Sequence, residues 1–106
     1  MTPHGPLSDH DLEKIIDAAT IYLCACPAQV AEQILRLRQL LRYQQNCLQQ
    51  KDTDTEVHQT IGRATERALA IMDECIDQVL SLEKWDRNTL TMPEGLRARR
   101  DAQLPT

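Results

Sequence analysis

Apolar side chains recur every three or four positions along three stretches of the 106-residue chain, separated by short polar or proline-containing segments. This spacing is typical of α-helices that bury one face, so it predicts three helices. The first begins after Ser8, a favourable N-cap, and Asp11 can accept a hydrogen bond from the cap amide. Leu7 and Leu12 can pack as a hydrophobic staple across this start. The apolar positions of this helix are Leu12, Ile15, Ile16, Ala19 and Leu23.

The second predicted helix begins near Pro27 and ends near Gln50, and the third begins at the capping-box pattern Thr53-Asp54-Thr55-Glu56. No stop signal interrupts the third helix before Asn88, although Gly62 weakens it locally and could permit a close helix crossing. The apolar positions of the second helix are Val30, Ile34, Leu37, Leu40, Leu41, Cys47 and Leu48. Those of the third helix are Val57, Ile61, Ala64, Ala68, Ile71, Met72, Cys75, Ile76, Val79, Leu82 and Trp85.

Pro27 decides how the first two helices connect, because proline removes a helical hydrogen bond and bends or ends a helix. The segment from Thr20 to Pro27 contains none of the usual loop residues, which favours one kinked rod over residues 9–50. We therefore predict an all-α fold, in which this rod and the third helix form a long antiparallel hairpin with a kink or break at Pro27. Two such hairpins would pair as a dimeric four-helix bundle. The alternative is a monomeric three-helix bundle, in which the first helix folds back.

The composition sets limits on location and partners. The net charge of −4 disfavours nucleic-acid binding, and no apolar run has the length of about 20 residues that a membrane span needs. We expect a cytoplasmic protein with reduced cysteines. Residues 1–7 are predicted to be a flexible N-terminal arm, residues 8–88 the helical domain, and residues 89–106 a tail with the option of a short helix near Pro93. Arg36, Arg38 and Arg42 are expected to pair with Glu66, Asp73 and Asp77 or to be solvated.

Cysteines are the one candidate for chemistry. If Cys26 caps the helix that begins with Pro27, backbone amides and the helix dipole stabilise its thiolate. Equal rise along the two arms of the hairpin places Cys75 near Cys26, and Cys47 near His58. Cys24, Cys26 and Cys75 are thus a candidate metal site for zinc or copper, and Cys26-Pro27 is a candidate haem ligand. The competing interpretation, which we favour, is that these cysteines pack as small apolar side chains and that no cofactor is bound.

The chain contains no nucleophile motif, phosphate loop or dinucleotide fingerprint. We therefore expect no enzymatic activity. The leading hypothesis is a small helical adaptor or regulator that acts as a homodimer and binds a protein partner. The alternative is a metal-, haem- or redox-sensing protein that uses Cys24 and Cys26 together with Cys75.

Overall fold

The computed structural model describes residues 6–19, 26–48, 55–93, 95 and 102. These residues form three helices: α1 (Asp9–Ala19), α2 (Cys26–Leu48) and α3 (Thr55–Leu82). The same residues contain no strand beyond an isolated bridge between Asp86 and Thr91. The predicted all-α class is confirmed.

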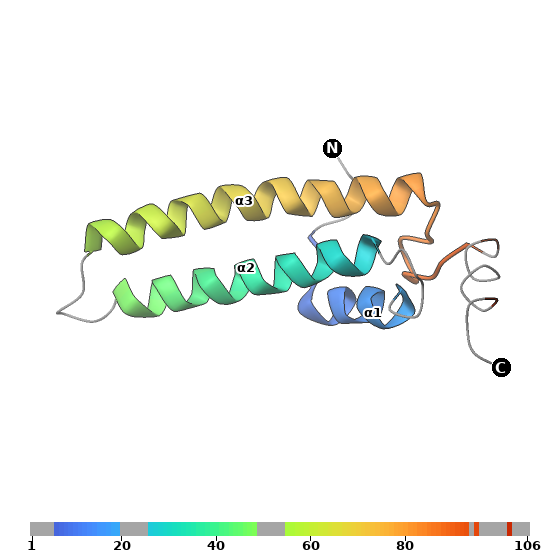
Figure 1. The fold of residues 1–106 in the computed structure, drawn as a ribbon, viewed down its shortest axis with the longest axis horizontal. Coiled ribbons are helices and arrows are strands. Elements are labelled where there is room, and N and C mark those ends of the chain that lie inside the picture. The colour runs from blue at the N-terminus through green and yellow to red at the C-terminus, as the bar shows by residue number, and fades with distance from the viewer. Residues whose placement is uncertain (1–5, 20–25, 49–54, 94, 96–101, 103–106) are drawn as a thin grey trace.

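α2 and α3 form an antiparallel hairpin, and α1 lies alongside the first half of α2 (Figure 1). The continuous rod predicted for residues 9–50 is therefore wrong, and the folded-back path of the first helix is correct. Asp9 at the start of α1 contacts Arg38 in the middle of α2, which a continuous rod would not allow. Folding back buries Leu12 and Ile15, which would otherwise need a partner chain to cover them.

The hydrophobic core occupies the end of the hairpin that α1 covers. Its members come from all three helices and from the segments that flank them: Leu7, Leu12, Ile15, Ala19, Ala28, Ala31, Ile34, Ile76, Leu80, Trp85, Leu90 and Met92. None of these residues lies between 35 and 75, so the half of the hairpin nearer its turn adds none of these core side chains. We call this half, residues 39–48 and 55–68, the distal arm.

The N-terminus of α1 carries the predicted capping box. The Asp11 amide donates to Ser8 Oγ at 3.0 Å, and the Ser8 amide donates to Asp11 Oδ2 at 3.1 Å. Leu7 and Leu12, the expected staple, are both buried in the core. Thr53, the predicted cap of the third helix, lies outside the described residues.

α3 ends at Leu82. The sequence predicted that this helix continues to Asn88, and that prediction is wrong. Lys84 adopts a left-handed conformation with φ of 62°. The Trp85 amide then donates to the Leu80 carbonyl at 2.9 Å, and the Lys84 amide to the Ser81 carbonyl at 3.0 Å. These two bonds form a Schellman motif, which usually has glycine at its left-handed position. Position 84 is a lysine and not a glycine, so the usual sequence signal for a helix end was absent and the end of α3 was not predicted.

Residues after α3 turn back onto the core. The Asp86 carboxylate accepts hydrogen bonds from the amides of Asn88 and Thr89, and the Asp86 amide donates to the Thr91 carbonyl at 2.9 Å. This turn carries Leu90 and Met92 into the core, beyond the boundary at residue 88 that the sequence suggested.

Candidate functional site

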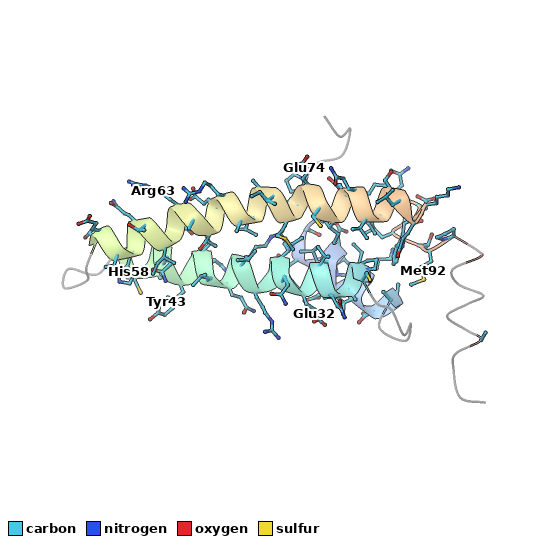
Figure 2. The ribbon with its side chains drawn as sticks, turned by 45° about the horizontal axis from the view of Figure 1, so that its top comes forward. Glu32, Tyr43, His58, Arg63, Glu74 and Met92 are labelled. Carbon is cyan, nitrogen blue, oxygen red and sulfur yellow. The ribbon has the colours of Figure 1, made fainter. Side chains whose placement is uncertain are left out.

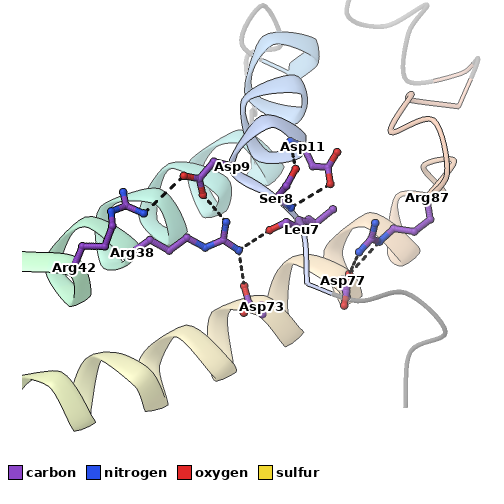
Figure 3. Close-up of polar contacts among 9 residues, drawn as sticks. All are labelled: Leu7, Ser8, Asp9, Asp11, Arg38, Arg42, Asp73, Asp77 and Arg87. Atoms are coloured by element: carbon purple, nitrogen blue, oxygen red, sulfur yellow. Dashed lines mark hydrogen bonds and ion pairs between the residues drawn. The ribbon is translucent and has the colours of Figure 1, made fainter. Parts of the chain in front are cut away.

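Arg38 joins the start of α1 to both other helices (Figure 3). Its Nη1 atom lies 2.6 Å from Asp9 Oδ1, and its Nη2 atom donates to the Leu7 carbonyl at 2.6 Å. The same Nη2 atom lies 3.9 Å from Asp73 Oδ1 on α3. The Arg38 side chain is only 19% exposed, so these contacts are partly shielded from water and salt. This cluster ties the start of α1 to α2 and approaches α3.

The predicted arginine–acid pairs are only partly present. Arg38 does approach Asp73, but its shortest ion pair is with Asp9, and Arg42 approaches Asp9 at 3.9 Å. Asp77 pairs with Arg87, whose Nη2 lies 3.1 Å from Asp77 Oδ1. Burial raises the pKa of Asp73 above its ordinary value, against the opposing effect of Arg38. Asp9, Asp73 and Asp77 therefore each lie beside an arginine.

The distal arm has a polar seam between its two helices. His58 Nδ1 lies 2.5 Å from Oε1 of Gln44, a buried residue. The sequence placed His58 beside Cys47, so the observed pairing differs by about one helical turn. Beside this pair is an open groove of about 280 Å³, whose lining includes Leu41, Gly62 and Glu66. Gly62 is not at a close crossing, because a Cβ there would meet nothing within 4 Å.

Large apolar side chains are exposed along the hairpin. On α2 these are Leu40 and Tyr43, and on α3 they are Val57, Ile71 and Leu82. Tyr43 is 62% exposed, Ile71 65% and Leu82 81%. Figure 2 shows Tyr43 on the side of α2 that faces away from α3, and Glu74 on the side of α3 that faces away from α2. Two helices cannot enclose a core by themselves, and within the part of the chain that the structure describes these five apolar side chains are exposed.

The apolar set predicted for the third helix mixes two rows of side chains. The row facing α2 consists of Thr65, Leu69, Met72, Ile76 and Leu80, which are buried or half-buried. Val57, Ala64, Ile71 and Leu82 were predicted to be core positions but are exposed. The sequence analysis missed Leu69 and Leu80. Their spacing to Met72 and Ile76 was a usable signal, but the outer row has the same helical spacing.

The candidate thiols are only partly located. Cys26 is exposed in the first turn of α2, and Cys75 is half-buried on α3. Cys24 lies outside the described residues, so the three-thiol site stays a prediction. Among the residues that the structure describes, no three His, Cys, Asp or Glu side chains are grouped to hold a metal ion. Cys26, Cys47 and Cys75 form no disulfide in this part of the chain.

Comparison of the chain with protein-family models, with curated proteins and with solved structures finds no match. None of the helices formed by the described residues combines the length and hydropathy of a bilayer-spanning segment. Among the described residues, the exposed apolar side chains of the hairpin are the feature that bears most directly on function.

Proposed function

We propose that this protein is a small cytoplasmic adaptor or regulator without catalytic activity, which acts as a homodimer through the apolar side chains of its hairpin. The observation that carries the proposal is the exposure of Ile71 on α3 and of Tyr43 on α2, two large apolar side chains that lie outside the core. Exposed large apolar side chains can mark a site of protein association when they gather in one patch, and the proposal is that these side chains do so in the dimer.

The experiment is sedimentation of a paired variant. Tyr43→Glu combined with Ile71→Glu places charge on both helices of the hairpin. Both side chains are more than half exposed, so neither change removes a core contact. Burying a charge at an interface is costly, and we expect self-association to weaken by roughly a hundredfold. Ala70→Glu is the matched control, since Ala70 is an exposed α3 residue beside Ile71 but on another side of the helix. Equal association of the paired variant and the native protein would contradict the proposal.

The rival is a thiol-based metal, haem or redox sensor that uses Cys24, Cys26 and Cys75. What favours it is the exposed position of Cys26 at the first turn of α2, where backbone amides stabilise a thiolate. Elemental analysis, an absorption spectrum and a thiol count on freshly purified protein separate the two functions. Bound zinc, copper or haem that is lost in Cys26→Ser would establish the rival. A full count of free thiols with no metal or haem would exclude the metal- and haem-binding forms.

A further inference from the structure

A second apolar row runs along the whole of α3, outside the core. We call it the outer row, and it consists of Val57, Ile61, Ala64, Ala68, Ile71, Cys75 and Leu82. Successive members are separated by four or three residues, except for one gap of seven, where Gln78 occupies the missing position. This is the a/d spacing of a heptad repeat, sustained over nearly four heptads. At 1.5 Å per residue the row is about 38 Å long.

In the described part of the chain, Val57, Ala64, Ile71 and Leu82 of the outer row are exposed, and Ile61, Ala68 and Cys75 are half-buried. α3 packs on α2 through the row that contains Met72 and Ile76, and the outer row lies about 100° around the helix from it, at 3.6 residues per turn. Asp73, which Arg38 approaches, lies about 60° from Ile76 in the other direction. The N-terminus of α1 is thus held on the side of α3 away from the outer row. No member of the outer row belongs to the core.

We propose that the outer row binds the outer row of a second copy in antiparallel orientation. This inference rests on the proposed function and specifies its interface. A heptad seam is complementary to another helix with the same repeat, because both supercoil at 3.5 residues per turn. Paired in this way, two hairpins form a four-helix bundle from α2 and α3 of each chain.

Charge favours the antiparallel orientation. The exposed positions that flank the outer row, on the side away from α2, are Thr60, Arg67, Glu74 and Ser81. In antiparallel pairing, flanking positions of the same type meet across the seam, so Arg67 of each copy lies beside Glu74 of the other. In parallel pairing, Arg67 would lie beside Met72 and Glu74 beside Val79, with no complementary charge. Opposite charges at such flanking positions set partner choice and orientation in coiled coils.

Side-chain size favours the same orientation. In the antiparallel register, Ala68 faces Ile71 of the other copy, Ala64 faces Cys75, and Val57 faces Leu82. A small residue thus opposes a larger one in both central layers, which fills space more evenly. Parallel pairing would stack Ala64 on Ala64 and Ala68 on Ala68, and the two smallest layers would leave voids.

Disulfide crosslinking tests this register. The background variant replaces Cys24, Cys26 and Cys47 by serine and keeps Cys75. Adding Ala64→Cys places a thiol opposite Cys75 of the other copy, and a mild oxidant that accepts the two thiol hydrogens should then convert most of the protein to a covalent dimer. The background variant alone and its Ala70→Cys derivative should stay uncrosslinked. A dimer linked through Cys75 alone would overturn the antiparallel register in favour of the parallel one.

A charge exchange on exposed residues gives a second, independent measurement. Arg67→Glu or Glu74→Arg alone should weaken self-association by roughly tenfold, since each dimer contains two such pairs. The double variant Arg67→Glu/Glu74→Arg should restore native association. A native protein that dimerises but gives neither the Ala64–Cys75 crosslink nor charge rescue has another interface, which overturns this inference and leaves the proposed function standing. A native protein that does not self-associate contradicts both.

Discussion

Arg38 and Asp9 are 29 positions apart in sequence, yet Nη1 of the arginine lies 2.6 Å from Oδ1 of the aspartate. This contact fastens the start of α1 beside the middle of α2. It excludes a continuous helix through Pro27, and it leaves the distal arm as a two-helix projection. The fold-back completes the core at one end, and Leu40, Tyr43 and Val57 are exposed in the distal arm.

Arg38→Ala should destabilise the protein by about 2 kcal/mol, because a partly buried residue would lose its bonds to Asp9 and to the Leu7 carbonyl together. Urea denaturation measures this change as a shift in the unfolding midpoint. Arg42→Ala is the matched control. That side chain is 56% exposed and approaches Asp9 only at 3.9 Å, so its loss should cost about 0.5 kcal/mol or less. Equal losses in the two variants would contradict the role of Arg38.

Gly62→Ala should stabilise the protein by about 1 kcal/mol. Glycine in a helix interior is less favourable than alanine by that amount, and a Cβ at position 62 meets nothing within 4 Å. Thermal or urea unfolding measures the difference in stability between the variant and the native protein. No gain, or a loss, would mean that the space beside Gly62 is occupied in solution.

Lys84 and Leu90 have the same left-handed backbone but should respond to glycine in opposite directions. Their φ angles are 62° and 56°. Lys84→Gly relieves strain at an exposed C-cap and should stabilise by about 1 kcal/mol. Leu90→Gly relieves similar strain but removes a buried side chain, so it should destabilise by about 2 kcal/mol. Urea or thermal unfolding of the two variants measures their changes in stability. Changes of the same sign would contradict the environments assigned to Lys84 and Leu90.

Asp11 and Asp73 should affect the pH dependence of stability with opposite signs. Hydrogen bonds from the Ser8 backbone and side chain lower the pKa of Asp11 in the folded state. Its contribution is therefore present above the ordinary value of 3.8 and is lost as the pH falls through the folded-state pKa. Burial raises the pKa of Asp73, so its ionisation destabilises the fold as the pH rises through that pKa.

The matching variants are Asp11→Asn and Asp73→Asn, compared with native protein from pH 2 to 7. Asp11→Asn should be less stable than native at pH 7, with the difference closing in acid. Asp73→Asn should be more stable than native at pH 7, and its advantage should also vanish in acid. Differences of the same sign at pH 7 would contradict the environments assigned to the two carboxyl groups.

Local signals in the sequence were enough to predict the helices. The Ser8–Asp11 capping box and the apolar spacing of α2 and α3 identified the three elements, because these features depend on neighbours within one or two turns. The path between the first two helices was not predictable in this way. Pro27 permits either a kink or a reversal, and the choice depends on what α1 can bury and on the distant pair Arg38–Asp9.

The candidate site was harder to predict from the sequence than the helices were. Two apolar rows on α3 have the same spacing. Nothing local says that Ile76 in one row is buried while Ile71 in the other is exposed. That difference depends on the position of α2. The arginine pairs were misassigned for a related reason, since Asp9 reaches Arg38 only after α1 folds back.

The most direct test of the central claim is the mass of the native protein in solution, measured by light scattering across micromolar concentrations. One chain has a mass of 12.1 kDa. The account predicts twice this mass at the higher concentrations, with a decline toward the single-chain value only on dilution. A mass of 12.1 kDa at every concentration would contradict the homodimer and with it the proposed use of the hairpin surface.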